Sequence, residues 1–386
     1  MANAFIDDLR WRGLFHLSTD AKELEERLNK GPITAYCGFD PSADSLTVGN
    51  LVPMVLLKRL KMAGHKPMLL LGGVTGMIGD PKPDSERQML TQEQIAHNIS
   101  CIQKQVQKFI GTDDIPIVNN ADWLAQMSIV EYLRDVGKYF SVNVMMGKDS
   151  VTARLEGSSG ISFTEFSYQT LQGYDFYHLL KEKNCELQCA GADQWGNITA
   201  GLDYIRKRLG KEAYAFCAPI ITKADGKKFG KSESGAVWLD AKKTTPYQFY
   251  QFWLNVEDAK AAEYLKIYSF KPRAELEAII AEGTAKPETR AIQRALAEEL
   301  TVLLHGPKAL DEAKAASLAL FGQAELSSLS AETLRAVCET IPAMKIAAGQ
   351  PLPDLSAALV ETKLVPSKNL ARQEIGAGGI YVNNVR

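Results

Sequence analysis

The chain has 386 residues, which is enough for two or three domains with hydrophobic cores of their own. Hydrophobic residues make up 46% of the chain and charged residues 23%, as is ordinary for a globular protein in water. The net charge of −2 excludes a globally basic nucleic-acid-binding protein, so any contact with nucleic acid would come from local basic patches.

Neither a targeting segment nor a membrane span is expected. The first residues, MANAFIDDLRWRG, are acidic and lack the apolar core of a secretory signal, and no apolar run approaches the length of a membrane span. Of six scattered cysteines, only Cys185 and Cys189 are close in sequence, and no Cys/His pair at zinc spacing accompanies them. We therefore expect reduced thiols in a cytoplasmic protein, with a metal site at these two cysteines as a remote alternative.

The first strand–loop–helix junction follows an expected helical arm at residues 1–30. The apolar run Ile33–Cys37 predicts a buried strand, and a mostly apolar helix is expected from Leu51 onward. In α/β proteins such a junction binds phosphates, because free N–H groups at the helix N-terminus point at the ligand. The loop also carries hydroxyls, at Ser42, Ser45 and Thr47. An ordinary capped turn is the alternative interpretation, since the loop contains no dinucleotide or Walker fingerprint.

Strands and helices alternate through the N-terminal half of the chain. Further strands are predicted at Lys66–Leu71, at Ile115–Val118, in the run that starts at Leu187, and at Ala218–Thr222. Helical segments are expected between them, at 85–110, at 124–180 and in the segment that carries Arg206 to Lys211. Since each strand ends in a polar, glycine-containing loop, the pattern predicts a doubly wound α/β fold with a Rossmann-like parallel sheet. Its site should lie at the carboxyl ends of the strands.

Three polar groups lie where such a site would form. Asp80 ends the glycine-rich run after the second strand, and Asn120 follows the third. Tyr168, Gln172 and Asp175 fall on one face of a helix, because they are spaced at i, i+4 and i+7. A pocket for a polar ligand would explain all three groups. A glycine-rich turn, a helix cap and a solvated helix face are the alternatives.

The C-terminal half changes character after a basic loop. Residues 223–235 contain four lysines and three glycines, which suits a mobile clamp on a polyphosphate, although a solvated basic turn is the alternative. Residues 245–320 are rich in Ala, Glu, Lys and Leu and are expected to form a separate helical domain. A linker should follow, and then two short helices and a strand from about Pro351.

Six motifs in this order closely resemble the bacterial tyrosyl-tRNA synthetases, which are class I aminoacyl-tRNA synthetases. The motifs are YCGFDPSADSL, GGVTGMIGDP, NNADW, FTEFSYQTLQGYDF, GADQWGN and KFGKS. The resemblance runs from about Trp11 to the C-terminus and implies five segments. They are a Rossmann-like catalytic domain with a dimer-forming insertion (1–222), a signature loop and linker (223–244), an α-helical anticodon-binding domain (245–322), a linker (323–350) and a truncated S4-like RNA-binding segment (351–386).

The resemblance also implies a reaction and its residues. L-Tyrosine would react with ATP to give tyrosyl-adenylate and pyrophosphate, and the tyrosyl group would pass to the 3′-terminal adenosine of tRNA(Tyr). The implied tyrosine-binding residues are Tyr36, Asp80, Asn120, Tyr168, Gln172 and Asp175. The implied ATP- and adenylate-binding residues are Gly38, Asp40, Ser42, Thr47, Gly49, Asn50, Gly191, Asp193, Gln194, Lys228 and Lys231. The implied catalytic residues are Lys228, Lys231, Ser232, Thr47 and Asn50.

Cofactor and partners follow from the same resemblance. ATP would be a substrate that carries Mg²⁺ on its phosphate oxygens, with no metal held by the protein itself. The chain would be a cytoplasmic homodimer with tRNA as its nucleic-acid partner and no membrane partner. The apolar stretch Tyr139–Met146 would be dimer interface or core, and Arg206–Arg208 would touch the tRNA acceptor end or form a solvated helix face.

The chain departs from the family pattern in its first motif. Thr47 and Asn50 occupy positions where the HIGH-like motif usually has histidines, which puts the rate of adenylate formation in question. A non-catalytic RNA-binding relative is therefore one alternative, although the KFGKS loop and the tyrosine pocket argue against it. A tryptophanyl-type synthetase is another, but Tyr36 with Asp175 suits a phenol. We also expect that the chain stops inside the S4-like module, because it ends soon after YVNN.

Overall fold

The structure is a computed structural model that describes residues 2–81, 89–111, 114–157, 160–227, 229–232, 235–320, 326, 329–339 and 341–382. The chain divides into two compact units. The first comprises residues 1–240 and 257–292, and the second comprises residues 241–256 and 293–386.

A six-stranded sheet lies at the centre of the first unit, with strand order β1-β6-β5-β2-β3-β4. The strands are β1 (Leu17–Ser18), β2 (Thr34–Phe39), β3 (Lys66–Leu71), β4 (Ile117–Asn119), β5 (Cys185–Gly191) and β6 (Tyr214–Ala218). All neighbours are parallel except β1, which runs antiparallel to β6. The side chains of β3 after its first residue are all buried, as expected of a central strand covered on both faces.

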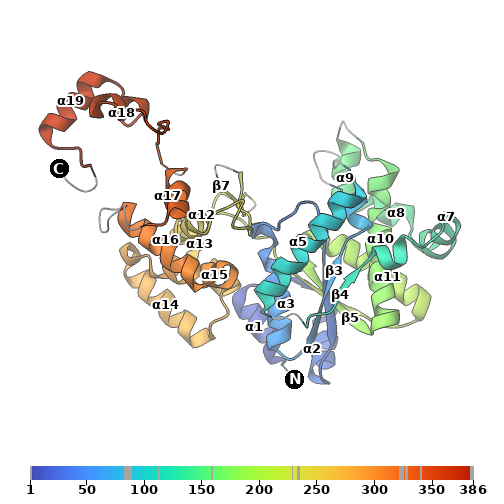
Figure 1. Cartoon of the computed structure of the whole chain (residues 1–386). Helices are drawn as coiled ribbons and strands as arrows, with labels where there is room; N and C mark the ends of the chain where they lie inside the picture. Colours follow the sequence, from blue (N-terminus) through green and yellow to red (C-terminus); the bar gives the residue numbers. More distant parts are fainter. Residues whose placement is uncertain are drawn as a thin grey trace. The chain divides into compact units, whose positions relative to one another are not determined.

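Helices cover both faces of this sheet (Figure 1). On one face, α3 (Leu51–Met62) packs against β2, β3 and β5, with α5 (Gln92–Ile110) beside it. On the other face, α10 (Phe163–Lys183) and α11 (Trp195–Leu209) pack against each other and against β5. The sequence sets the limits of α10, because the Ser162 side chain accepts a hydrogen bond from the Glu165 N–H at the start and Asn184 adopts a left-handed conformation at the end.

The remaining elements of the first unit are short. Before β5 they are α1 (Ala4–Arg12), α2 (Ala21–Asn29), η1 (Val48–Asn50), α4 (Thr75–Ile78), α6 (Ala121–Leu124), α7 (Ile129–Glu131), η2 (Tyr132–Val136), η3 (Gly137–Tyr139), α8 (Val142–Met146) and α9 (Asp149–Glu156). After β5 they are η4 (Ala192–Gln194), β7 (Lys231–Ser232), β8 (Gly235–Ala236), α13 (Asp258–Tyr268), α14 (Arg273–Ala285) and η5 (Pro287–Thr289).

Helix α13 belongs to the first unit because two buried arginines attach the end of this helix to the sheet domain. The Arg12 guanidinium donates to the carbonyl oxygens of Lys266 and Ser269 at 3.1 and 3.0 Å, and Arg59 also donates to the Ser269 oxygen. The segment expected as one helical domain at 245–322 is therefore divided between the two units.

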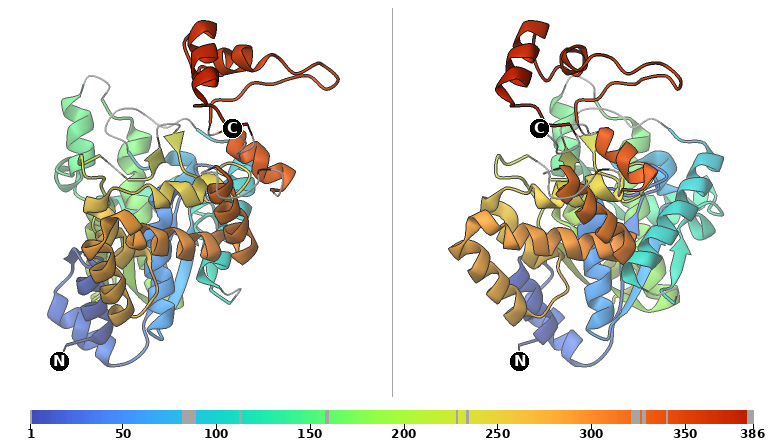
Figure 2. Two further views of the ribbon diagram at one scale, coloured as in Figure 1. Left: turned by 90° about the vertical axis from the view of Figure 1, so that its left-hand side faces the viewer. Right: turned by 60° about the vertical axis from the view of Figure 1, so that its left-hand side comes forward.

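The second unit is helical in its described residues. Its helices are α12 (Pro246–Leu254), α15 (Ala291–His305), α16 (Pro307–Leu320), α17 (Ala331–Cys338), α18 (Leu355–Glu361) and α19 (Lys368–Ala377). Helix α12 buries Phe249 and Trp253 and packs against α16 and α17. Figure 2 shows α18 and α19 side by side in red, and they share a small cluster of Leu359, Val365 and Ala371. The strand expected after these helices lies partly outside the described residues.

The doubly wound α/β fold expected from the sequence is confirmed. One strand was misplaced: the prediction of a strand at Ala218–Thr222 is wrong, since β6 runs from Tyr214 to Ala218. Pro219 has no N–H for the ladder, so the chain leaves the sheet where the strand was expected to begin.

Candidate active site

The site lies where the strand order reverses. From β2 the chain continues outward through β3 and β4, whereas the neighbouring β5 leads outward to β6 in the other direction. At such a switch point the loops after the two strands diverge and leave a crevice at their carboxyl ends. A cavity of about 600 Å³ is found there, lined by residues of β2, β5 and the loops that follow them.

A buried carboxylate lies at one end of this cavity. Asp175 is only 1% exposed. Its carboxylate accepts hydrogen bonds from Trp123 Nε1 at 2.8 Å and from Asn120 Nδ2 at 3.0 Å. Asn120 is fixed in turn, since its side-chain oxygen accepts the Val74 N–H at 2.8 Å and its amide also donates to Thr75 Oγ1 at 3.0 Å. These hydrogen bonds hold the Asp175 carboxylate in a single orientation and connect it to the loops after β3 and β4.

Burial shifts the pKa values of Asp175 and of the neighbouring Tyr36. Removal from water raises the pKa of Asp175 to about 7, although the hydrogen bonds from Asn120 and Trp123 lower it. Burial, and then the charge of Asp175, raises the pKa of the Tyr36 hydroxyl well above its usual value. Tyr36 thus keeps its proton, and its buried hydroxyl has no hydrogen-bond partner in the described part of the chain. A donor beside an acceptor is complementary to a ligand hydroxyl, which can accept one bond and donate another.

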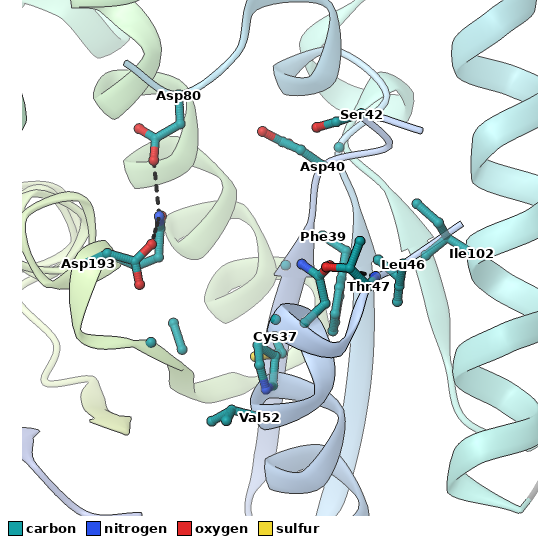
Figure 3. A pocket seen from close by; sticks show the side chains of 18 of the residues that line it. Cys37, Phe39, Asp40, Ser42, Leu46, Thr47, Val52, Asp80, Ile102 and Asp193 are labelled. Carbon is teal, nitrogen blue, oxygen red and sulfur yellow. Dashed lines mark hydrogen bonds between the residues drawn. The ribbon is translucent and has the colours of Figure 1, made fainter. Parts of the chain in front are cut away.

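A second polar network surrounds Asp80. Its carboxylate accepts from Gln194 Nε2 at 3.0 Å and from Asn197 Nδ2 at 3.2 Å. Asn197 also donates to Gln172 Oε1 at 3.1 Å, so one amide orients two acceptors. Figure 3 shows Asp80 with its dashed bond to the side of the cavity that also carries Asp193. A carboxylate and an amide oxygen side by side suit a ligand cation such as an ammonium group.

Asp40 lies across the cavity from Asp80 (Figure 3). It accepts a hydrogen bond from the Tyr168 hydroxyl at 2.8 Å and another from Thr75 Oγ1 at 2.8 Å. Tyr168 is one of the tyrosine-binding residues that the family resemblance implies, and in the structure its hydroxyl is bonded to Asp40. Asp40 therefore links the loop after β2 to α10.

The turn after β2 is braced by its own side chains. Asn50 Oδ1 accepts from both the N–H and the hydroxyl of Thr47, at 3.0 Å each. The backbone of the same turn pairs with the segment that follows β8, through Val48 N to Val237 O at 2.9 Å and a bridge from Thr47 to Trp238. The KFGKS segment is thereby brought next to this turn. Lys228 of that motif lies outside the described residues.

A glycine makes this contact possible. Gly230 has a φ of +109°, and a Cβ there would lie 2.9 Å from Gly49 N, so a side chain would both strain the backbone and collide with the turn.

Most of the residues expected from the sequence meet in this cavity. It is lined by Tyr36, Gly38, Asp40, Ser42, Thr47, Gly49, Asn50, Asp80, Tyr168, Gln172, Asp175, Gly191, Asp193 and Gln194. Asn120 is fully buried and does not line the cavity, so its effect passes through Asp175. Lys231 and Ser232 form β7.

Comparisons with known proteins identify the family of this chain. Residues 28–322 match the family described as tRNA synthetases class I (W and Y). The chain belongs to this family of synthetases. A tyrosine–tRNA ligase of Streptomyces griseus is 52% identical over 99% of this chain and 90% of that protein, and one of Opitutus terrae is 50% identical over 99% and 91%.

Solved structures of the family have the same fold as this synthetase. A C-terminally truncated mitochondrial tyrosyl-tRNA synthetase of Aspergillus nidulans matches with a TM-score of 0.74 and 29% identity, over 82% of this chain and 94% of that one. A tryptophanyl-tRNA synthetase of Plasmodium falciparum matches with a TM-score of 0.59 and 18% identity, over 86% and 87% of the two chains, which shows the fold alone.

Several residues of the synthetase site were not found from the sequence. Trp123 and Thr75 bond to the carboxylates of Asp175 and Asp40, and Asn197 orients Asp80 and Gln172. All three residues lie within the six motifs. Their partners Asp40, Asp175 and Asp80 are 35 or more residues away along the chain, and only Gln172, the second partner of Asn197, is nearer. Gln188 also lines the cavity and was not found. The one signal in the sequence was that it is a polar residue inside an apolar strand.

Two absences concern only the residues that the structure describes. Across them, no set of three or more His, Cys, Asp or Glu side chains is arranged to hold a metal ion. None of the helices described is both long and apolar enough to cross a membrane.

Proposed function

We propose that this synthetase is a tyrosine–tRNA ligase, which joins L-tyrosine to tRNA(Tyr) in two steps through tyrosyl-adenylate. The single observation that carries the proposal is the unpartnered Tyr36 hydroxyl beside the buried Asp175. A phenol would accept from Tyr36 and donate to Asp175, whereas phenylalanine would leave both groups unpaired. Rejection by unpaired polar groups is the established behaviour of tyrosyl-tRNA synthetases in general. The names of the relatives at 50–52% identity support the same activity.

The rest of the amino acid would extend from the phenol site toward Asp80. We assign its α-ammonium group to Asp80 and Gln172, whose oxygens share Asn197 as a donor. Tyr168 would act beside them through Asp40, to which its hydroxyl is bonded. Asn120 would act on the phenol through Asp175.

We assign ATP to the turns at the carboxyl ends of β2 and β5. The proposed contacts are Gly38, Asp40, Ser42, Thr47, Gly49, Asn50, Gly191, Asp193 and Gln194, all of which line the cavity. At Gly191 a Cβ would come within 2.6 Å of an Asp193 oxygen, so a side chain there would displace the Asp193 carboxylate. Lys228, Lys231 and Ser232 of the KFGKS segment would bind the phosphates, and Mg²⁺ would arrive on the ATP phosphates.

The residues would promote the reaction by position and charge. The carboxylate of tyrosine would attack the α-phosphorus of ATP as pyrophosphate leaves in line, so the reactants themselves supply nucleophile and leaving group. Fixing both ligands in one crevice lowers the entropic part of the barrier. Lysines would stabilise the negative charge that develops on pyrophosphate. In the second step the terminal ribose hydroxyl of the tRNA would attack the mixed anhydride and release AMP.

Amino-acid-dependent exchange of pyrophosphate into ATP tests this proposal. We expect exchange with tyrosine and none with tryptophan. The Asp175→Ala variant should lose exchange at a micromolar tyrosine concentration that saturates the wild type, while Asp122→Ala, an exposed aspartate next to Trp123, should behave as wild type. Exchange driven by tryptophan would point to the other branch of the family. No exchange with any amino acid would favour a non-catalytic RNA-binding relative.

We further propose that the synthetase is a homodimer in the cytoplasm. Large apolar side chains from α7 to α8 are exposed, namely Ile129, Val130, Leu133, Val142, Val144 and Met146. Of the two interpretations of the stretch Tyr139–Met146, core fits Phe140, which stacks on Tyr204, and the buried Met145, whereas the exposed residues fit an interface. Exposed apolar residues gathered in one segment are typical of an interface. Sedimentation should show a dimer that the double change Val142→Glu, Val144→Glu dissociates, whereas Met62→Glu on α3, also at an exposed apolar residue, should leave it intact.

Contacts with tRNA are the remaining part of the proposal. Lys207 donates to the Tyr139 carbonyl at 3.0 Å and Arg208 to the Tyr139 hydroxyl at 3.1 Å, so these cations are ordered against η3. Ordered positive charge on the surface suits the phosphates of an acceptor stem. Changing both to Ala should weaken aminoacylation and leave pyrophosphate exchange unchanged. An equal loss of both activities would contradict a role in tRNA binding.

A further inference from the structure

Gln188 is a buried amide whose side chain the fold itself does not use. It lies within β5, between Leu187 and Cys189, and only 3% of it is exposed. Its carboxamide oxygen is buried without a hydrogen-bond partner in the described residues. A buried polar group without a partner destabilises the fold, and such groups are rare in native proteins, so Gln188 needs a physical reason.

The neighbour of Gln188 across the sheet is Tyr36. The two residues are in register on the parallel strands β5 and β2, so their side chains leave the sheet on the same face. Both line the cavity of the candidate active site. Tyr36 also carries a buried polar atom without a partner. Two adjacent side chains with unsatisfied polar atoms in one cavity indicate a polar ligand group at this place.

A second buried glutamine shows that an unpaired oxygen alone does not make a site. Gln169 on α10 is also 3% exposed, and its carboxamide oxygen is likewise unpaired. Its amide nitrogen, however, donates to the Phe166 carbonyl at 3.3 Å, and the residue does not line the cavity. What distinguishes Gln188 is therefore its position beside Tyr36 on the cavity wall.

The chemistry of a phenol provides a partner for this amide. A hydroxyl can donate one hydrogen bond and accept two. In the proposed complex Asp175 takes the donated bond and Tyr36 fills one lone pair, which leaves the second lone pair open. The carboxamide can present its N–H₂ group, because a half turn about its terminal torsion exchanges nitrogen and oxygen. We propose that Gln188 is a third hydrogen-bonding residue for the phenolic hydroxyl and so a specificity-determining residue of the enzyme.

This inference rests on the proposed function, since it takes tyrosine as the substrate. It adds a neutral donor to the ionisable pair of Tyr36 and Asp175. The aromatic ring is remote from the reacting atoms, so the contact should be equally strong in the ground state and the transition state. Loss of the contact should consequently raise the KM for tyrosine and leave kcat nearly unchanged.

The test compares Gln188→Met with Gln169→Met. Methionine has nearly the length of glutamine but no hydrogen-bonding amide. We measure kcat and KM for tyrosine and for phenylalanine by pyrophosphate exchange, with melting curves of each protein. Gln188→Met should lower kcat/KM for tyrosine about tenfold, the usual size for a neutral hydrogen bond, and leave that for phenylalanine unchanged. Gln169→Met should leave kcat/KM unchanged for both tyrosine and phenylalanine.

The outcomes separate this inference from the proposed function. A parallel fall for tyrosine and phenylalanine, or no change for either, would overturn the role of Gln188. Absence of tyrosine-dependent exchange in the wild type would instead overturn the proposed function. If Gln188→Met does not fold, Gln188→Leu offers a different apolar shape for the same comparison, and a preserved ratio of tyrosine to phenylalanine in it would be equally decisive against the inference.

Discussion

The buried carboxylate of Asp175 should make tyrosine recognition depend on pH. Burial raises its pKa to about 7, and the ionised form accepts the phenolic hydrogen much more strongly than the protonated form does. An acid is ionised above its pKa, so the productive form grows as the pH rises through 7. About one-tenth of the molecules carry the ionised group at pH 6 and about nine-tenths at pH 8, from the definition of pKa. We therefore expect kcat/KM for tyrosine to rise about tenfold between these pH values, since this parameter reports the free enzyme.

The assay is pyrophosphate exchange at saturating ATP between pH 6 and pH 8.5. Phenylalanine at high concentration serves as the internal control, because its reaction uses the same ATP and the same KFGKS segment but offers no hydroxyl to Asp175. The ratio of kcat/KM for tyrosine to kcat/KM for phenylalanine should thus depend on the ionisation of Asp175 alone. Asp175→Asn should abolish the pH dependence of this ratio, because the amide does not titrate. A ratio that is flat in the wild type, or that keeps its slope in Asp175→Asn, would refute this account of the phenol site.

Three further changes test other parts of the molecule. Lys231→Ala should lower kcat about 100-fold with little change in the KM for tyrosine, since its charge is assigned to the leaving pyrophosphate; a change in KM alone would contradict that assignment. Asn50→Ala removes the acceptor for the Thr47 N–H and hydroxyl and should raise the KM for ATP about fivefold, which a tyrosine-specific effect would exclude. Arg154→Met leaves the fully buried Glu165 without its partner at 2.8 Å and should cost about 3–5 kcal/mol of stability in chemical denaturation, whereas an unchanged midpoint would contradict a stabilising role for this ion pair.

Local sequence patterns predicted most of the sheet but not all of its limits. The apolar runs before Phe39 and Leu71 have both the composition and the length of buried strands, and β2 and β3 lie there. The run Pro219-Ile-Ile also has strand composition, yet the hydrogen bonds of β6 are made by the five residues before Pro219. The strand ends at Ala218 because Pro219 has no N–H to donate to the sheet, although two β-branched residues follow it.

The domain limits were harder to predict than the sheet. Helix α13 has the same Ala- and Lys-rich composition as the other C-terminal helices, so composition alone assigns it to them. The carbonyl oxygens at and just after its end are bound by Arg12 and Arg59, which lie more than 200 residues earlier. Contacts of this range have no signature in local sequence.

The candidate site shows the same limit at the level of single side chains. Tyr36 and Asp175 were expected from a family resemblance, and the structure places them at one cavity. What the sequence did not indicate is how each is oriented, since Trp123 reaches Asp175 across 52 residues and Gln194 reaches Asp80 across 114. Gln188 was not predicted because its relevance depends on the strand that lies beside it.

The pairing of β2 with β5 has a consequence for synthesis of the chain. Cys37 of β2 donates from its thiol to the carbonyl of Cys189 on β5, and 152 residues separate the two. While the ribosome makes the residues between them, β2 is the edge of an incomplete sheet and presents its apolar face and unpaired N–H and C=O groups to the solvent. We expect the nascent chain to be aggregation-prone and a client of chaperones until Gly191 has emerged. A fragment that ends before β5 should consequently bind neither tyrosine nor ATP, although it contains half of the cavity wall.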